Sequence, residues 1–280
     1  MPADLHCHTK ISDGSTGLDE LVAVAKKSTL SAIAVTDHDT FAGASRAKVI
    51  GDRQGVTVIP GVEMSCYDKR RGRPVHLLGY MSARPDKLVG VCKHTSDARK
   101  KAMQQMLARV MRKYPLTVEM VTKCATGSTN IFKQHIMNAL MNCGYSTTVY
   151  GELYDELFGA GSGSCRVEVE YPDVFEVLAL LKSSGAVTVL AHPYMYDSIE
   201  LMPELCEQGL HGVEVWHPNC EPEQSAYLQR FAMENDLIAT GGTDFHGMYS
   251  REPRTLGTCT TPDDMLEKLV SLGEKLNKNL

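Results

Sequence analysis

Residues 3–8 of the chain read ADLHCH, and residues 32–39 read AIAVTDHD. Both stretches begin with the largely apolar residues of a buried strand, β-branched in the second, and both end in side chains that can bind metal ions. The pattern returns in VTVIPGVE (56–63), VTVLAHP (187–193) and LIATGGTDFH (237–246). Because helical segments separate these strands, the sequence predicts parallel β/α units.

Seven strands and six helices follow from this pattern. The predicted strands are 3–8, 32–36, 56–59, 75–78, 187–191, 212–216 and 237–240. The predicted helices are 18–27, 41–54, 174–184, 201–208, 222–235 and 263–272. Seven units around one sheet fit a closed α/β barrel better than an open, doubly wound sheet.

The middle of the chain departs from this alternation. Residues 86–163 show little strand signal and contain two helical patterns, 97–114 and 131–143. The run GAGSGS (159–164) lacks the Gly-Lys-Ser/Thr ending of a phosphate-binding loop, so it is predicted to be a flexible join. We therefore expect residues 1–85 and 164–280 to form the barrel, with 86–163 as a helical insert that caps it.

The first helix of this insert is rich in basic residues, which raises the alternative of an RNA-binding surface. Its basic side chains are Arg99, Lys100, Lys101, Arg109, Arg112 and Lys113. Base stacking usually needs several aromatic side chains, and Tyr114 is the only one in this helical pattern. An amphipathic helix packed against the rest of the protein is the favoured interpretation.

The composition is that of an ordinary globular protein. The chain has 280 residues, 43% hydrophobic and 22% charged, and a formal net charge of -5, which gives no overall basic field for nucleic acid. No apolar run approaches the roughly 20 residues of a membrane span. Nine cysteines without a C-x-x-C pair, and a start that does not resemble a secretory leader, lead us to expect a cytoplasmic protein with reduced thiols. Nothing indicates an obligate protein partner.

Metal-ligand side chains recur at or just beyond the ends of the predicted strands. His6 and His8 lie two residues apart on a strand, so both imidazoles face the same side and can reach one ion. Asp244 and His246 repeat this spacing. The full set of candidate metal ligands is His6, His8, Asp13, His38, Glu63, His76, His192, Asp244 and His246. Because the carboxyl ends of barrel strands meet at one rim, the sequence predicts that these side chains form one site.

The motifs that carry these residues resemble those of a known superfamily. HCHT (6–9) with SDG (12–14), TDHD (36–39), PGVE (60–63), AHP (191–193) and GTDFH (242–246) are similar, in this order, to the successive motifs of the polymerase and histidinol phosphatase (PHP) superfamily. They span almost the whole chain, and the insert resembles the small-molecule branch. The resemblance implies a distorted (β/α)7 TIM-like barrel with two to three divalent Mn, Fe or Zn ions.

The resemblance also implies how the ligands divide among the ions. One ion would take His6, His8, Glu63 and Asp244; a second would share Glu63 and add His76 and His192; a third would take Asp13, His38 and His246. Glu63 and Asp244 would then be catalytic, with a hydroxide held between two ions as the nucleophile that attacks phosphorus.

Several further residues are candidates for contact with substrate. Lys133 and His135 stand where relatives often show Arg-x-His and are candidates for a second phosphate site, although a solvated helix face would explain them equally well. Arg166 and Ser65 are further candidates for phosphate binding. His217 follows a predicted strand and is a candidate proton donor to the leaving group, with a packing role as the alternative.

These observations together predict a phosphoric ester hydrolase. We expect a substrate that is a small phosphorylated metabolite, such as a nucleotide 3′,5′-bisphosphate or a ribose phosphate, including a cyclic one. A short-oligonucleotide exonuclease, a histidinol-phosphate phosphatase, an amidohydrolase acting on a C–N bond and a metal-holding module without turnover are the alternatives. Amidohydrolases usually carry a bridging lysine at a strand end, and this sequence has none at those positions.

Overall fold

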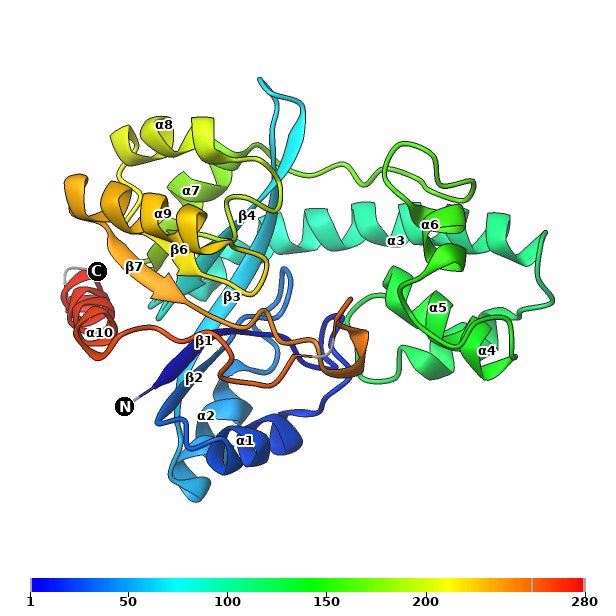
Figure 1. Cartoon of the computed structure of the whole chain (residues 1–280), viewed down its shortest axis with the longest axis horizontal. Helices are drawn as coiled ribbons and strands as arrows, with labels where there is room; N and C mark the ends of the chain where they lie inside the picture. Colours follow the sequence, from blue (N-terminus) through cyan, green and yellow to red (C-terminus); the bar gives the residue numbers. More distant parts are fainter. Residues whose placement is uncertain (1, 253, 279–280) are drawn as a thin grey trace.

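A computed structural model describes residues 2–252 and 254–278, and its strands form one sheet that curves into a barrel (Figure 1). The strands are β1 (Ala3–Cys7), β2 (Ala32–Val35), β3 (Thr57–Asp68), β4 (Arg73–Tyr80), β5 (Val187–Leu190), β6 (Gly212–Trp216) and β7 (Ile238–Gly241). They lie in the sheet in the order in which they occur in the chain. The seven-stranded α/β barrel predicted from the sequence is confirmed.

The segment that follows β7 lies against β1 and nearly closes the barrel. The His8 backbone N–H donates to the Phe245 carbonyl at 2.8 Å, and the Phe245 N–H donates to the His6 carbonyl at 3.2 Å. Asp4, which is fully buried in β1, accepts hydrogen bonds from the backbone N–H groups of Thr243 and Gly257, both at 2.9 Å. A charged residue in the first strand therefore fixes the end of the barrel to its beginning.

The prediction of parallel units throughout is wrong at β4. This strand pairs antiparallel with both β3 and β5, whereas the other neighbouring pairs are parallel. The reason is the length of β3, which continues to Asp68 and returns directly through a short turn as β4. A strand that returns in this way has its amino-terminal half, which contains His76, at the rim where the parallel strands end. The sequence predicted that His76 lies at or beyond the carboxyl end of a strand. It lies instead inside β4.

The helices of the barrel agree with the prediction to within a few residues at most ends. They are α1 (Leu18–Lys27), α2 (Ala44–Gln54), α7 (Val174–Ser183), α8 (Met202–Glu207), α9 (Pro222–Glu234) and α10 (Asp263–Lys278). Leu269 of α10 is fully buried in the same apolar cluster as Leu5 and Val189. In Figure 1, α10 (red) lies at the end of the barrel farthest from α4, α5 and α6, so it covers the end opposite the insert.

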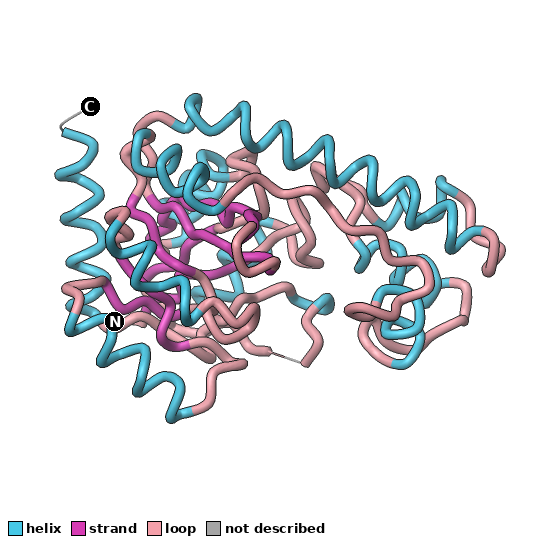
Figure 2. The backbone as a smooth tube through the Cα atoms, turned by 90° about the horizontal axis from the view of Figure 1, so that it is seen from above, coloured by secondary structure: helices cyan, strands magenta, loops and turns pink. Residues whose placement is uncertain are grey.

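Four helices separate β4 from α7. They are α3 (Val89–Met111), α4 (Val118–Cys124), α5 (Lys133–Asn142) and α6 (Glu152–Phe158). Figure 2 shows the long helix α3 extending from the barrel to the group formed by the other three. These helices pack around their own apolar cluster, which includes Met106, Ile136 and Phe158. The segment before α5 is bound to the barrel, because the Ser128 hydroxyl donates to the Ser12 carbonyl at 2.5 Å.

None of the helices in the described ranges combines the length and the apolarity that crossing a lipid bilayer requires.

Gly242 offers a test of the close approach between the segment after β7 and β1. A Cβ atom at this position would lie 2.3 Å from the Cβ atom of His6 and 2.6 Å from its backbone nitrogen. We expect Gly242→Ala to lower the free energy of unfolding by about 1–3 kcal/mol, because one of the two backbones must move. Urea unfolding followed by circular dichroism measures this change. Gly90→Ala, where a Cβ meets no atom within 4 Å, is the control and should stay within about 0.5 kcal/mol of the wild type. Equal stability of the two variants would contradict the close approach.

Candidate metal centre

The nine candidate ligands meet at one rim of the barrel. Four overlapping groups have ligand atoms that all lie within 4.8 Å of one another: His8, Asp13, His38 and His246; His6, His8 and Asp244; His6, Glu63 and His192; and His38, Glu63 and His76. The side chains come from six strands or the segments that follow them. Residues that are up to 240 positions apart in the sequence, such as His6 and His246, thus belong to one cluster.

Glu63 lies at the centre of the cluster. One carboxylate oxygen, Oε1, lies 2.8 Å from His76 Nδ1 and 2.9 Å from His192 Nε2. The other, Oε2, lies 3.1 Å from His8 Nε2 and 3.3 Å from both His6 Nε2 and His38 Nδ1. Five imidazoles therefore surround a single carboxylate whose residue is only 1% exposed. This is the geometry of a ligand that can be shared between ions.

Asp13 and Asp244 complete the anionic part of the cluster. Asp13 Oδ1 lies 3.2 Å from His246 Nε2, and Asp13 Oδ2 accepts a hydrogen bond from Gln134 Nε2 of α5 at 3.1 Å. Asp244 Oδ1 lies 3.4 Å from His8 Nε2. Of the four groups, the one around Asp13 contains the third predicted ligand set together with His8.

Several buried imidazole nitrogens in this cluster have no hydrogen-bond partner among the described residues. They are His6 Nε2, both nitrogens of His8, His38 Nδ1 and His192 Nδ1. Buried polar atoms are rarely left without a partner, so their gathering next to three carboxylates is what a set of metal ligands would show. A mixed imidazole and carboxylate set suits Mn, Fe or Zn better than Mg or Ca. The residues present fit divalent transition metals.

The carboxylates remain ionised although they are buried. Burial alone would raise the pKa of Glu63, but His76, His38 and His6 hold it well below its usual range. His246 and His38 have the same effect on the pKa of Asp13, again against burial. In the opposite direction, Asp244 and Glu63 raise the pKa of His8 to about 10 although burial lowers it. The cluster is therefore rich in negative charge that needs cationic partners.

Two ligands stand on backbone that side chains rarely adopt. His192 has φ 25° and Asp244 has φ 51°, both in the positive range that costs roughly 1–3 kcal/mol for a residue other than glycine. Asp39, next to His38, has φ 53°. His192 and Asp244 lie two and three residues beyond the ends of β5 and β7, and Asp39 directly follows His38.

Glu214 is a functional residue that the sequence interpretation missed. Its Oε1 atom lies 2.9 Å from His6 Nδ1, and its Oε2 atom accepts a hydrogen bond from the His192 backbone N–H at 2.8 Å. This contact at Nδ1 leaves His6 Nε2 facing Glu63, and a carboxylate that binds the far nitrogen of a metal-binding histidine orients its ring in this way. The signal was available, because Glu214 is the single charge in the strand GVEVW and it is fully buried there.

Arg99 was also missed as a site residue. It lies on α3 and is 4% exposed, and its Nη2 atom donates to Asp39 Oδ2 at 2.7 Å and to Ser65 Oγ at 3.0 Å. Its Nη1 atom is buried and has no hydrogen-bond partner in the described ranges. Arg99 precedes the buried residues Ala102 and Met106 by three and seven positions, so it stands on the apolar face of the helix. A cation on that face is the signal that could have revealed it.

His217 lies beside the cluster, with Nε2 3.5 Å from Asp244 Oδ2. Its Nδ1 atom accepts a hydrogen bond from the Asn219 backbone N–H at 3.1 Å. A neutral imidazole that accepts at Nδ1 carries its proton on Nε2. His217 therefore presents an N–H group toward the metal ligands, and it is not available there as a ligand itself.

The structure separates Lys133 from His135. Both are on α5, but side chains two residues apart on a helix point in different directions. Lys133 is half-buried, and burial together with the nearby positive charge of Arg166 lowers its pKa to about 8. His135 is buried beside Tyr249, with ring centroids 5.8 Å apart. Ser65 does not point freely into the site, because its hydroxyl is held by Arg99.

Comparison with known proteins places this arrangement in a family. The PHP domain model matches residues 4–158, more than half of the chain. The chain is 36% identical over 255 residues to the phosphoribosyl 1,2-cyclic phosphate 1,2-diphosphodiesterase of Eggerthella lenta, covering 90% of this chain and 97% of that protein. It is 27% identical to a 5′-3′ exoribonuclease of Haemophilus influenzae, over 87% of this chain and 89% of that protein.

A solved structure from Bifidobacterium adolescentis, described as a metal-dependent phosphoesterase, has the same fold. Its TM-score is 0.88 at 30% identity, with 97% of this chain and 96% of that chain covered. The chain belongs to the PHP domain family, as its motifs indicated. It is a phosphoesterase of the metal-dependent kind, a hydrolase of phosphate esters.

Glu214 provides a test of how the centre is oriented. We expect Glu214→Gln to weaken the binding of Mn or Zn by about 10–100-fold, because the neutral amide no longer fixes the ring of His6. Competition with a metal-binding dye measures the dissociation constant. The control is Glu207→Gln, which alters an exposed residue of α8. Unchanged metal affinity in a folded Glu214→Gln protein would show that this carboxylate does not support the centre.

Proposed function

We propose that this enzyme hydrolyses a phosphate ester bond on the ribose unit of a small phosphorylated metabolite, at a centre of two to three Mn, Fe or Zn ions. The observation that carries the proposal is the buried cluster in which Glu63 lies within 3.3 Å of nitrogens from five imidazoles, with Asp13 and Asp244 alongside. We assign the three ions to the predicted ligand sets, with Glu63 shared between two of them.

The names of two relatives support a ribose phosphate as the substrate. The Eggerthella lenta protein is named for a phosphoribosyl cyclic phosphate, and the Haemophilus influenzae protein is named for RNA. Both names describe phosphodiesters on ribose. A cyclic phosphate diester is the first candidate because it belongs to the relative with the higher identity, and a nucleotide bisphosphate remains the second.

Bound divalent ions would supply positive charge for the phosphate oxygens and would lower the pKa of a bound water into the neutral range. The part of the chain is to hold those ions and to orient the ester. Asp13, Glu63 and Asp244 bring three negative charges, and three divalent ions bring six positive ones. The centre therefore keeps an excess of positive charge that favours an anionic ester, although the chain as a whole carries a net charge of -5.

Cationic side chains from the insert add to this preference. We assign the buried Nη1 group of Arg99 to a phosphate oxygen, because that atom has no other partner in the described residues and Arg99 contacts Ser65, two residues from Glu63. Lys133 and Arg166, which follows the insert in the chain, would form a second anion site for a phosphate away from the reacting one, with the ion pair of Arg166 and Glu168 beside it. In this arrangement the insert covers the substrate from above the rim.

His217 is our candidate for the proton donor to the leaving group. Its Nδ1 atom is occupied by the Asn219 N–H, so the proton on Nε2 faces the centre beside Asp244. A donor fixed in one tautomer can pass its proton to the departing oxygen without rearranging first. Membership of a phosphoesterase family favours this chemistry over C–N bond hydrolysis.

A substrate panel with metal analysis tests the proposal directly. Purified protein, loaded in turn with Mn, Fe and Zn, is incubated with a phosphoribosyl cyclic phosphate, adenosine 3′,5′-bisphosphate, histidinol phosphate and an amide substrate. We expect turnover of a ribose phosphate, with two to three metal ions per chain by elemental analysis, and no release of amine. Turnover of histidinol phosphate alone, or full activity in metal-free protein, would contradict it.

Glu63→Gln tests the shared carboxylate. The variant keeps the size of the side chain but removes the charge that several imidazoles face, so we expect turnover to fall by at least about 10²–10³-fold. Steady-state rates with the substrate identified above give the measurement, and circular dichroism confirms that the fold is kept. Glu20→Gln, at an exposed position on α1, is the control. Near-normal turnover with Glu63→Gln would rule out this residue as the shared ligand.

A further inference from the structure

The loop after β5 carries a tyrosine that the sequence interpretation did not consider. Tyr196 follows the candidate ligand His192 by four residues. The Met195 backbone N–H donates to the His192 carbonyl at 2.9 Å. The Ser198 backbone N–H donates to the Pro193 carbonyl at 2.7 Å. These two bonds fold the loop into a tight turn around Tyr196, so the backbone position of the tyrosine is tied to that of the ligand.

A second contact fixes this loop to the neighbouring strand. Arg73, at the start of β4, donates to both the backbone carbonyl and the carboxylate of Asp197. Asp197 directly follows Tyr196, and Arg73 precedes the candidate ligand His76 by three residues. Tyr196 is therefore held from two sides, by the strand that carries His76 and by the loop that carries His192.

The ring of Tyr196 packs edge-on against two candidate ligands. Its centroid lies 5.0 Å from that of His76 and 5.4 Å from that of His192, with interplanar angles of 65° and 71°. These are the two histidines whose nitrogens lie next to the same oxygen of Glu63, Oε1, at 2.8 Å and 2.9 Å. Tyr196 is half-buried in this position. The tyrosine therefore forms part of the wall of the metal cluster.

The hydroxyl of Tyr196 has no hydrogen-bond partner within residues 2–252 and 254–278. Burial raises the pKa of Tyr196, and the charges of Glu63 and Asp244 raise it further, so both carboxylates act on the hydroxyl. A phenol carries its proton at neutral pH and can donate it in a hydrogen bond. Because the hydroxyls of buried tyrosines usually have a partner, this one points to a ligand that accepts hydrogen bonds.

Arg99 reaches the same face of the sheet from the insert. It donates to the Ser65 hydroxyl through its Nη2 atom at 3.0 Å. Ser65 pairs directly with His76 in the register of β3 and β4. Residues that are directly opposite each other in an antiparallel pair have their side chains on the same face. The contacts of Arg99 and of Tyr196 with the sheet are therefore neighbours.

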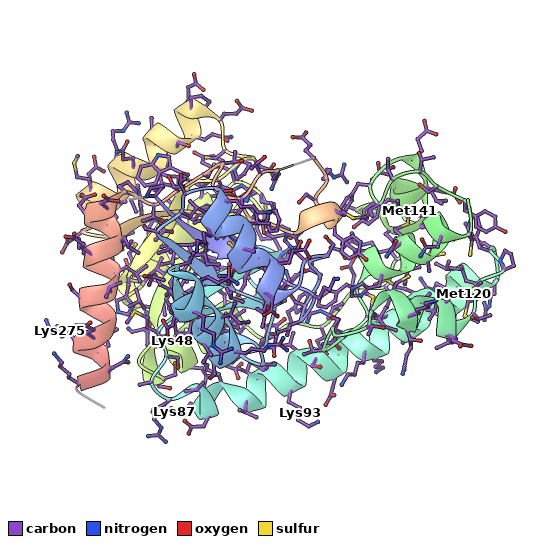
Figure 3. All side chains as sticks on the ribbon, turned by 90° about the horizontal axis from the view of Figure 1, so that it is seen from below. Lys48, Lys87, Lys93, Met120, Met141 and Lys275 are labelled. Atoms are coloured by element: carbon purple, nitrogen blue, oxygen red, sulfur yellow. The ribbon has the colours of Figure 1, made fainter. Side chains whose placement is uncertain are left out.

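Tyr171 connects these two residues. Figure 3 labels Lys93 in the first half of α3, beside the barrel, and Met120 on the insert; Arg99 follows Lys93 by six residues. The ring centroid of Tyr171, in the segment that returns from the insert to α7, lies 5.8 Å from the guanidinium carbon of Arg99. Tyr171 also raises the pKa of Tyr196, after burial and the two carboxylates. Arg99 and Tyr196 thus lie near each other at the edge of the metal cluster.

We propose that the Tyr196 hydroxyl donates a hydrogen bond to a nonbridging oxygen of the reacting phosphate. The proposal rests on the proposed function, because that phosphate must bind at the metal cluster. In phosphoryl transfer the charge of the transition state is spread over the equatorial oxygens, and a donor that is already in place stabilises it without rearranging. The tight turn and the contact with Arg73 hold this donor in place. Arg99 then supplies a charged donor to the phosphate and Tyr196 a neutral one.

The competing explanation is that the ring of Tyr196 only packs against the ligands. Tyr196→Phe separates the two explanations, because it keeps the ring and removes the hydroxyl. The matched control is Tyr194→Phe, which removes the same oxygen atom from the same loop. Tyr194 packs against the apolar cluster of the barrel. Burial raises its pKa, followed by Cys220 and Tyr227, so its hydroxyl lies toward α9 and not toward the metal ligands.

The test measures turnover and the binding of a transition-state mimic. Values of kcat and KM are determined for metal-loaded wild type and both variants on the ester that the substrate panel identifies. We expect Tyr196→Phe to lower kcat by about 10–100-fold, the scale of one hydrogen bond to a charged group, with KM within about threefold. Orthovanadate should bind to the metal-loaded variant about tenfold more weakly by calorimetry. Elemental analysis should find as many metal ions as in the wild type, and Tyr194→Phe should match the wild type throughout.

Three other outcomes decide against the hydrogen bond or isolate it. Equal kcat values for Tyr196→Phe and Tyr194→Phe overturn the proposal. A loss of metal ions from Tyr196→Phe also overturns it, because Tyr196 would then act by supporting His76 and His192. If the wild type hydrolyses no ester of the panel, the proposed function fails, and the titration with orthovanadate decides the role of Tyr196 by itself. Affinity that is about tenfold weaker in Tyr196→Phe supports the hydrogen bond, and equal affinity rejects it.

Discussion

Three carboxylates share one buried volume at the rim of this barrel, and their mutual repulsion is the constraint on which the site depends. Asp13, Glu63 and Asp244 are each 9% exposed or less. Water cannot neutralise them there, so the surrounding histidines must, and this raises the pKa of His6, His8 and His246. Metal ions that enter would take over the role of those protons. Binding of metal and release of protons are then one equilibrium.

The barrel supplies what this arrangement needs to stay assembled. Asp4 binds backbone groups from the segment after β7, and Asp37 binds the Thr9 N–H at 2.8 Å and the Ser12 hydroxyl at 2.6 Å. These carboxylates do not face the centre; they hold the loops that carry Asp13 and Asp244. Asp244, whose backbone has a positive φ, directly follows Thr243, to which Asp4 is bound. A rigid rim allows ligands that are far apart in sequence to remain close in space.

The sequence predicted those features that depend on local periodicity. His6 and His8 were expected to share a face because strand side chains alternate, and their rings lie 5.2 Å apart. It did not predict the reversal at β4, because a hairpin and a crossover begin with the same kind of strand. The sequence interpretation also missed Glu214 and Arg99. A charged residue within an apolar pattern indicates that its side chain has a buried partner, but the pattern does not identify that partner. The role of Lys133 and His135 as phosphate-binding residues stays a prediction, and their spacing of two on α5 places the side chains in different directions.

The insert reaches the candidate metal cluster at two points. Gln134 binds the ligand Asp13, and Arg99 binds Asp39 next to the ligand His38, so α5 and α3 each contact the cluster through one residue. Helix α5 also carries side chains that face elsewhere: Lys133 toward Arg166, and His135 into a pocket behind the Asp13 loop. The metal ligands can therefore remain the same in different members of the family while these outer side chains change. Under the proposed function, selection among phosphate esters would depend on these outer side chains, because the metal cluster at the barrel rim provides charge for any phosphate.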